Sequence, residues 1–315
     1  MGIGWRAMSA EETAQTIRRP CAIAPAAYAV RHHDRVRETL ESEFFAALVP
    51  RLIASAGGGR VLDLGCGDGL VARLAGPGLT EYTGVDFRSP SGPPPGRLVV
   101  HDLRDGLGHV GREPYDVYVG TFGVASHLAP GELARLLADV AAHARPGAVV
   151  AIEALGLHSL EWPRRWDSAP GRARTLSYRL HHDVRVHPWS PRELSRLYED
   201  AGIRTVGALD RSVQAGPKTG ETGYWPGLPP LREALNALMA GSAGRDAIDA
   251  LSDPLPPLPA GFAAGAHHAL AQRRARLVAA EQRPFGPHTA RSVWGLEPRS
   301  GRGLGHGLTV VGRVA

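Results

Sequence analysis

The residues best suited to chemistry lie in one short run, Val61-Leu62-Asp63-Leu64-Gly65-Cys66-Gly67-Asp68-Gly69-Leu70. The first four residues predict a buried strand, the alternate glycines predict a turn, and a helix is expected to begin at Leu70. Glycine permits positive φ and lets the backbone approach a ligand closely. A helix after such a turn aims unsatisfied N–H groups at the same point. The run therefore predicts a site for a nucleotide-type cofactor.

Two acids beside the turn indicate the charge of that cofactor. The dinucleotide fingerprint is G-x-G-x-x-G, with a diphosphate at the helix N-terminus. Here the spacing is G-x-G-x-G, and Asp63 and Asp68 flank it. Two carboxylates would repel a diphosphate, whereas they suit a ligand that carries ammonium and sulfonium charges.

Further acids close the next strands along the chain. Glu81 to Asp86 predicts a second strand, and Leu98 to Asp102 predicts a third. A carboxylate at the C-terminal end of a strand can accept hydrogen bonds from both hydroxyls of a ribose. Tyr115 to Gly120 and Val149 to Leu155 predict the fourth and fifth strands.

In order and spacing, these segments resemble the motifs of the class I S-adenosylmethionine-dependent methyltransferases. The resemblance implies S-adenosylmethionine as cofactor and S-adenosylhomocysteine as product. It also implies cofactor-binding roles for the turn, for the strand ends and for residues just past strand four. These residues are Asp63, Gly65, Cys66, Gly67 and Gly69 at the methionine part, Asp86 and Phe87 at the ribose, Asp102 and Leu103 at the adenine, and Gly120 and Thr121 near the methionine ammonium.

The fold class predicted from this pattern is α/β. Alternating strands and helices between 59 and 155 indicate βαβ units and a parallel sheet. A capping box, Ser190-Pro191-Arg192-Glu193, begins a later helix, and Ile203 to Leu209 and Gly305 to Val314 predict strands six and seven. The resemblance implies a seven-stranded, mostly parallel Rossmann-like sheet flanked by helices, with the last strand antiparallel beside strand five.

The expected core comprises residues 58–210 and 305–315, with one insertion inside the first range and two segments outside both. Residues 1–57 form an N-terminal arm with a helix from Asp34 to Ala56, in which Pro50 should cause a kink. Residues 156–189 form a lid insertion. Residues 211–304 form a helical cap between strands six and seven, with helices at Pro229 to Ala240 and Phe262 to Glu281. Both insertions would cover an acceptor pocket at the carboxyl ends of the strands; a dimerisation surface is the alternative use of the cap.

The residues after strand four bear on the methyl acceptor. The sequence from Gly120 to Leu128 lacks the Asn/Asp-Pro-Pro-aromatic motif of methyltransferases that act on amide or adenine nitrogens. It also lacks the Pro-Cys motif of cytosine C5 methyltransferases. This indicates the small-molecule branch. His127 is either a base near the methyl group, with an imidazole poised near neutral pH, or a residue that packs at the strand end.

Other candidates come from the two insertions. Arginines there could clamp an acceptor carboxylate or phosphate, and aromatic residues could wall the pocket. For any single arginine, a place in a solvated surface loop is the more common alternative. The acceptor-binding candidates are Arg164, Arg165, Trp166, Tyr178 and Arg211. A divalent metal site could use His181, Asp183 and His187, and His182 and His187 are further candidate catalytic residues. His267 and His268 are expected on an exposed helix face.

Composition limits the remaining choices. With 43% apolar and 21% charged residues the chain is an ordinary globular protein, and no apolar run suggests a membrane span. The net charge of +5 comes almost entirely from arginine without a dense basic run, which argues against a nucleic-acid partner. Two cysteines, one inside the turn, indicate a cytoplasmic location. A homodimer stays open.

The sequence therefore predicts methyl transfer from S-adenosylmethionine to a small molecule, such as a secondary-metabolite or amino-acid-derived precursor, by in-line displacement. The alternatives are a metal-assisted C-methyltransferase acting on a 2-oxo acid, an RNA methyltransferase, a non-catalytic S-adenosylmethionine-binding regulator and a nicotinamide oxidoreductase.

Overall fold

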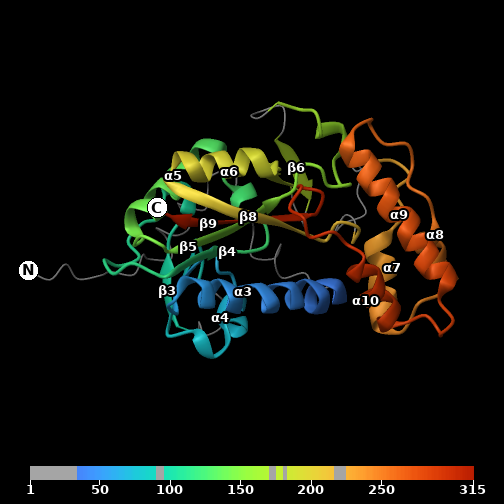
Figure 1. Ribbon diagram of the computed structural model, residues 1–315, viewed down its shortest axis with the longest axis horizontal. Coiled ribbons are helices and arrows are strands. Elements are labelled where there is room, and N and C mark those ends of the chain that lie inside the picture. The colour runs from blue at the N-terminus through green and yellow to red at the C-terminus, as the bar shows by residue number, and fades with distance from the viewer. Residues whose placement is uncertain (1–33, 90–95, 170–174, 180–182, 216–224) are drawn as a thin grey trace, which may run out of the picture.

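The computed structural model describes residues 34–89, 96–169, 175–179, 183–215 and 225–315. A central sheet carries helices on both faces, and a separate group of helices, α7 to α10, lies beyond one end of it (Figure 1). The first 33 residues of the predicted arm fall outside the described part of the chain.

The sheet has seven strands in the order β3-β2-β1-β4-β5-β9-β8. Neighbours from β3 to β5 are parallel, and β9 runs antiparallel to both β5 and β8. The predicted fold class and the antiparallel last strand are therefore confirmed. The strands are β1 (Arg60–Leu64), β2 (Glu81–Asp86), β3 (Arg97–Val100), β4 (Val117–Gly120), β5 (Val149–Leu155), β8 (Ile203–Arg211) and β9 (Gly307–Val314).

The central strands are mostly apolar because both of their faces are covered. Every residue of β5 is buried, and so is every residue of β4. This is the pattern expected for parallel strands under helices. The third strand ends at Val100, earlier than predicted, because Asp102 caps a single 3-10 turn, η3 (Leu103–Asp105), instead of continuing the strand.

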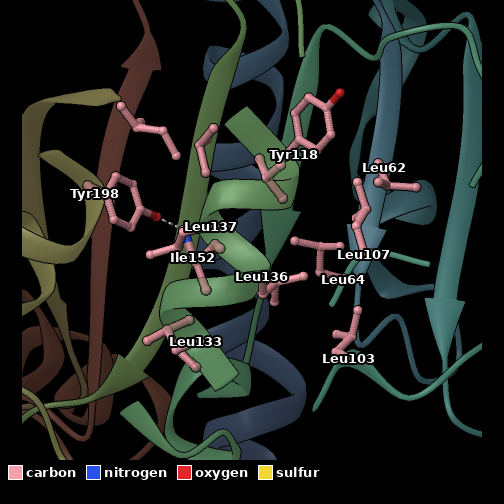
Figure 2. Packing of buried hydrophobic residues seen from close by; sticks show 14 of the residues in the cluster. Leu62, Leu64, Leu103, Leu107, Tyr118, Leu133, Leu136, Leu137, Ile152 and Tyr198 are labelled. Atoms are coloured by element: carbon pink, nitrogen blue, oxygen red, sulfur yellow. Dashed lines mark hydrogen bonds between the residues drawn. The ribbon is translucent and has the colours of Figure 1, made fainter. Parts of the chain in front are cut away.

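Two hydrophobic cores hold helices to the sheet. On one face, Phe45 and Ile53 of α3 (Ser42–Ala56) pack with strand residues and with α4 (Leu70–Leu74). On the other face, α5 (Pro130–His143) supplies leucines at helical spacing and α6 (Pro191–Asp200) supplies Leu194 and Tyr198. Figure 2 shows the α5 leucines and Tyr198 against the strands. Tyr198 of α6 also accepts a hydrogen bond from Ile152 N–H at 3.0 Å and donates to the Val310 carbonyl at 3.1 Å.

The helix predicted from Asp34 to Ala56 is present but differs in detail. It begins as a π-helical turn, η1 (Val36–Glu41), and α3 then continues through Pro50 to Ala56. The sequence also predicts a buried face at a four-residue spacing, formed by Val36, Leu40, Phe44 and Leu48. The first three are buried, but Leu48 is only half-buried and Val49 is buried instead. A strict four-residue spacing drifts around a helix of 3.6 residues per turn, which explains the difference.

The helical cap has its own core. The predicted helices are α7 (Leu231–Ala240) and α9 (Phe262–Ala280), and the sequence missed the shorter α8 (Arg245–Ser252) and α10 (Pro287–Gly295). Leucines of α7 and α8 pack together with Val36 and Leu40 of η1. The cap is therefore joined to the core through the helix that precedes the first strand.

The expectation of an exposed His267 was wrong. Its side chain is fully buried, because Nε2 bonds the His158 carbonyl at 2.8 Å and the ring stacks on Trp166 at 5.7 Å. Burial chiefly lowers the pKa of this imidazole to about 4.

The lid insertion contains structure that the sequence did not reveal. A 3-10 turn, η5 (Pro163–Arg165), precedes a two-stranded antiparallel hairpin of β6 (Leu176–Arg179) and β7 (Asp183–Val186), which is separate from the main sheet. A bridge between Gly156 and Trp189 brings the two ends of the insertion together. Within the described ranges, no helix combines the length and apolar character needed to cross a bilayer.

Candidate active site

The glycine turn between β1 and α4 is fixed to the end of β2. The N–H groups of Gly65 and Cys66 both donate to the Val85 carbonyl, at 2.8 and 3.0 Å. Gly65, Gly67 and Gly69 have φ values of 70°, 52° and 75°, a region in which a side chain is strained. A Cβ added at Gly67 would meet nothing within 4 Å, so the turn has open space above it.

Asp86, at the end of β2, lies against this turn. Its Oδ2 accepts from the Gly67 N–H at 2.9 Å, and its Oδ1 accepts from the Arg88 N–H at 3.2 Å. Burial raises the pKa of the carboxyl, while these backbone donors oppose the rise. Phe87 follows directly, with the Arg88 guanidinium 4.7 Å above its ring. A half-buried carboxylate at this edge is well placed to accept from ribose hydroxyls.

Asp63 on β1 lies beneath the turn and is buried. Its Oδ2 accepts from the Tyr82 hydroxyl at 2.7 Å, and its Oδ1 has no hydrogen-bond partner. Burial, with the nearby charges of Asp86 and Asp68, raises the pKa of this carboxyl to about 7. An unpartnered acceptor surrounded by other acids calls for a positive charge, and a cofactor with ammonium and sulfonium groups meets that need.

Cys66 contributes backbone to the turn, while its thiol points at the sheet. A Cβ on Gly84 would lie 2.6 Å from the Cys66 Sγ, so the sulfur fills the space that Gly84 leaves. Burial and the charges of Asp63 and Asp86 raise the pKa of the thiol. The thiolate is the nucleophilic form, so both the burial of this thiol and the rise of its pKa disfavour reaction at Cys66.

Asp102 and Leu103 follow β3. Asp102 accepts from the Arg104 N–H at 3.0 Å, and both of its oxygens accept from the Arg104 guanidinium at 2.5–2.9 Å. Leu103 is buried. An adenine amino group would have to share this carboxylate with Arg104, and the adenine contact stays a prediction.

The end of β4 packs on the glycine turn from the other side. A Cβ on Gly120 would lie 2.5 Å from Val124, and one on Gly65 would lie 2.8 Å from the same side chain. Val124 begins the 3-10 turn η4 (Val124–His127), so η4 borders the glycine turn directly, and Thr121 lies in the short connection between β4 and η4.

His127 is the last residue of η4. Its Nδ1 is buried and has no hydrogen-bond partner. Burial, and to a lesser extent the proximity of His306, lower its pKa to about 4. A group with this pKa is a poor proton acceptor near neutral pH, which weakens the role of base predicted for it.

Sequence reasoning missed a carboxylate–imidazole pair near His127. The His306 Nδ1 lies 2.8 Å from the Glu161 Oε2, and both side chains are buried. The two residues are 145 positions apart, and neither belongs to a motif. Only the sheet topology, which brings the start of β9 beside the end of β5, joins them.

The acceptor-binding candidates are dispersed. Arg164 is exposed, with its guanidinium 5.8 Å from the Trp225 ring. Arg165 is half-buried. Trp166 is buried and donates to the Ser159 carbonyl at 3.0 Å, so together with its stack on His267 it anchors the lid to α9. The side chain of Tyr178 lies outside the described part of the structure.

Arg211 does not lie at an acceptor surface. It is fully buried, where Glu153 accepts from its Nη2 and Glu41 lies against its Nη1, each at 2.7 Å. Its guanidinium also lies over the rings of Phe45 and Phe122, at 5.3 and 5.1 Å. Burial lowers the pKa of Arg211, and the two carboxylates more than offset this and raise it. The acceptor contact predicted for Arg211 has no support in this placement.

The predicted metal ligands cannot be brought together here. His181 and His182, and the side chain of Asp183, lie outside the described residues. The His187 Nδ1 lies 3.2 Å from the Thr175 Oγ1, and the backbone N–H of His187 donates to the Ser126 carbonyl at 2.8 Å. Burial lowers the pKa of His187. Over the ranges that the structure describes, no three His, Cys, Asp or Glu residues are grouped to hold a metal ion.

The seven-stranded sheet and the acid-lined glycine turn at its carboxyl edge define a class I S-adenosylmethionine-dependent methyltransferase. The chain belongs to the family described as "Methyltransferase domain", whose model matches residues 33–207, more than half of the chain. No curated protein matches the sequence.

Several solved structures are similar in part. An S-adenosylmethionine-dependent methyltransferase from Archaeoglobus fulgidus is 16% identical, with 90% of this chain and 100% of that chain covered and a TM-score of 0.45. The 1,6-didemethyltoxoflavin-N1-methyltransferase of Burkholderia thailandensis is 18% identical, with 65% and 84% covered and a TM-score of 0.41. CalS10, an amino pentose methyltransferase from Micromonospora echinaspora, is 15% identical, with 69% and 97% covered and a TM-score of 0.40.

Proposed function

We propose that this protein transfers the methyl group of S-adenosylmethionine to a small-molecule acceptor by in-line displacement. The binding of this cofactor is supported chiefly by Asp63, which is buried beneath the glycine turn and whose Oδ1 has no hydrogen-bond partner. Asp86 lies against the same turn and accepts from the Gly67 N–H. Acidic groups in this arrangement favour a cationic nucleoside and disfavour a diphosphate.

The chain's own residues do most of their work by positioning. When bound, S-adenosylmethionine supplies a methyl group activated by a sulfonium. Asp86 would accept from the ribose hydroxyls, Asp63 would balance the positive charge, and Thr121 at the end of β4 would border the methionine part. Holding the reacting atoms in line and excluding water accounts for much of the rate in such transfers.

Two features support a small acceptor. The lid begins directly after β5, and the cap of α7 to α10 follows β8, so both insertions leave the same edge of the sheet as the turn. The residues after β4 also carry no nucleobase-methylating motif. The net charge of +5 is the one observation that favours RNA as the acceptor instead.

Methyl-labelled S-adenosylmethionine distinguishes these acceptors. We expect the purified protein, mixed with a bacterial extract, to transfer the label to a small molecule that separates from S-adenosylmethionine in chromatography, and this transfer should persist as salt is raised. Label in RNA with a steep salt dependence would identify an RNA methyltransferase, because phosphate contacts are lost as counterions compete. Absence of label from every fraction would favour a regulator that binds the cofactor without transfer.

Replacing Asp86 by alanine is expected to weaken S-adenosylhomocysteine binding by roughly 1.5–3 kcal/mol, as for hydrogen bonds to a charged group. Asp68→Ala is the matched control, because Asp68 is an exposed acid in the same turn that pairs with Arg73 at 2.9 Å. Its effect should stay below about 0.5 kcal/mol. Calorimetry measures both, and equal affinities for the wild type and Asp86→Ala would refute the ribose contact.

The finer features stay predictions. A secondary-metabolite or amino-acid-derived acceptor, a 2-oxo acid methylated with metal assistance, a cytoplasmic location and a homodimer all rest on the sequence reasoning given above.

A further inference from the structure

We propose that His306, hydrogen-bonded to Glu161, is the imidazole that accepts the proton of the methyl acceptor. The methylated atom is then the oxygen of an O–H group or the nitrogen of an N–H group. This assignment rests on the proposed function, and it moves the role of base from His127 to a residue that no motif indicates. It also favours an O–H or N–H acceptor over a 2-oxo acid.

The topology of the sheet places His306 at the carboxyl edge. Because β9 runs antiparallel to β5, its first residue, Gly307, pairs with the last residue of β5, Leu155. The His306 carbonyl accepts from the Gly156 N–H at 3.2 Å, and the His306 N–H donates to the Ser212 carbonyl at 3.1 Å. His306 is therefore fixed between the ends of two strands, at the edge where ligands of such sheets bind.

Direct contacts connect this position to the glycine turn. Val124 of η4 packs on the turn, and two residues later the Ser126 Oγ accepts from the Leu155 N–H at 2.8 Å. His127 follows Ser126, and His306 lies close enough to lower the pKa of His127. η4 therefore lies between the glycine turn and the His306–Glu161 pair, at the ends of β4 and β5.

The partner of His306 determines its chemistry. A carboxylate can only accept a hydrogen bond, so with Glu161 at 2.8 Å the neutral imidazole carries its proton on Nδ1 and its lone pair on Nε2. The same carboxylate stabilises the imidazolium that forms when a proton is taken up. Both side chains are buried, and electrostatic stabilisation of this kind is stronger in a buried environment than in water.

His127 cannot perform this role as well. It lies within the influence of a second imidazole, and its buried Nδ1 has no carboxylate partner. Two adjacent imidazoles do not both become charged, so the one that is held by an acid takes the proton. A further acid near His306 is Asp210 of β8, which accepts from the N–H groups of Arg302 and Gly305 in the preceding loop.

The proposed step is balanced. His306 Nε2 takes the proton of the acceptor O–H or N–H, and the freed lone pair forms a bond to the methyl carbon. The electron pair of the carbon–sulfur bond goes to sulfur, which changes the sulfonium to a thioether. The products are the methylated acceptor, S-adenosylhomocysteine and an imidazolium at His306, which later passes its proton to water.

Histidine NMR of the intact protein tests the assignment without knowledge of the acceptor. Long-range ¹H–¹⁵N spectra report the tautomer and the titration midpoint of each ring, with resonances assigned by His306→Gln, His127→Gln and Glu161→Gln. Two probes are compared: S-adenosylhomocysteine, and sinefungin, in which a carbon bearing an ammonium replaces the methylated sulfur. His143 is the control, because it bonds the Tyr118 hydroxyl at 2.7 Å from the far end of α5.

We expect His306 to carry its proton on Nδ1 and to titrate above His127. Sinefungin should lower its midpoint by about 0.5–1 pH unit relative to S-adenosylhomocysteine, because a positive charge then stands at the methyl position. His143 should be unaffected, and Glu161→Gln should lower the midpoint of His306. A proton on Nε2, or equal midpoints with the two probes, would overturn the assignment. Failure of S-adenosylhomocysteine to bind in calorimetry would instead overturn the proposed function, and the assignment with it.

Discussion

Replacing Arg211 by methionine is expected to lower the free energy of unfolding by about 3–5 kcal/mol, as for a buried ion pair that loses one partner. Arg211 is fully buried between Glu153 and Glu41, each 2.7 Å away, and methionine would leave the Glu153 carboxylate uncompensated in the core. Urea denaturation followed by tryptophan fluorescence measures the change.

A matched variant controls for the loss of an arginine. Arg291→Met removes a contact of the same 2.7 Å length to Glu43, but both of those side chains are about half exposed. It should cost less than about 1 kcal/mol. The double variant Arg211→Met with Glu153→Leu should recover part of the loss, because Glu41 keeps Arg232 at 3.1 Å. Equal effects of Arg211→Met and Arg291→Met would contradict the role assigned to the buried pair.

The buried charges join parts of the chain that are distant in sequence. Arg232 of the cap contacts both Asp34, at 2.7 Å, and Glu41 of η1, and Glu41 in turn contacts Arg211 at the end of β8. Ser212, beside Arg211, donates to Glu41 at 2.7 Å. This network fixes the cap to the strand ends, and we expect its loss to loosen both the cap and the site.

Replacing Asp63 by asparagine is expected to change both the free energy of unfolding and the affinity for the cofactor. Burial raises the pKa of Asp63 to about 7, above the ordinary value for the residue. A carboxyl whose pKa is higher in the folded than in the unfolded protein stabilises the fold while it is protonated. This contribution is fully present below the ordinary pKa of aspartate and is lost as the pH rises through 7. At pH 8 the empty protein therefore carries an unfavourable carboxylate. Asp63→Asn should raise its free energy of unfolding there by roughly 1–3 kcal/mol, measured by denaturation at pH 8.

The same substitution should have the opposite effect on the cofactor. A cationic ligand favours the carboxylate, so binding of S-adenosylmethionine releases the proton, and wild-type affinity should fall by up to about tenfold per pH unit below pH 7. Asp63→Asn should bind at least about tenfold more weakly at pH 8 and lose the pH dependence. Calorimetric titrations between pH 6 and 8 measure both.

Glu297→Gln is the control for this pair of effects. Glu297 is also buried, and burial raises its pKa to about 7, but it binds the Gln214 N–H in the cap. The Glu297→Gln substitution should stabilise the cofactor-free protein at pH 8 and leave its affinity for the cofactor unchanged. If Asp63→Asn binds S-adenosylmethionine as tightly as the wild type at pH 8, Asp63 does not balance the sulfonium.

The parts of the fold that the sequence predicted depend on local signals. β2 and β5 have the predicted limits, because β2 is a short segment that ends in an acid and β5 is a mostly apolar run that follows the turn at Arg145-Pro146-Gly147. The capping box of α6 is present, with Ser190 accepting from the Glu193 N–H at 3.3 Å and donating its own N–H to the Glu193 carboxylate at 3.1 Å. Glycine spacing alone located the turn that Asp86 holds.

The parts that it missed depend on contacts between distant residues. The β6–β7 hairpin is a pair of four-residue strands outside the main sheet, too short for a periodic pattern. Nothing near Arg211 in sequence reveals that Glu41 and Glu153 enclose it. Likewise, His306 and Glu161 meet only because β9 is inserted beside β5. Exposure and ion pairing at such sites follow from tertiary structure, so residue type alone led to the acceptor role for Arg211.

Calorimetric titration of the wild-type protein with S-adenosylmethionine, S-adenosylhomocysteine and NADH tests the central claim most directly. Carboxylates around an open glycine turn should bind one equivalent of either sulfur nucleoside, with a Kd of about 1–100 μM, and should give no binding heat with NADH. Tight binding of NADH, with neither sulfur nucleoside bound, would contradict the cofactor site and the methyl transfer proposed from it.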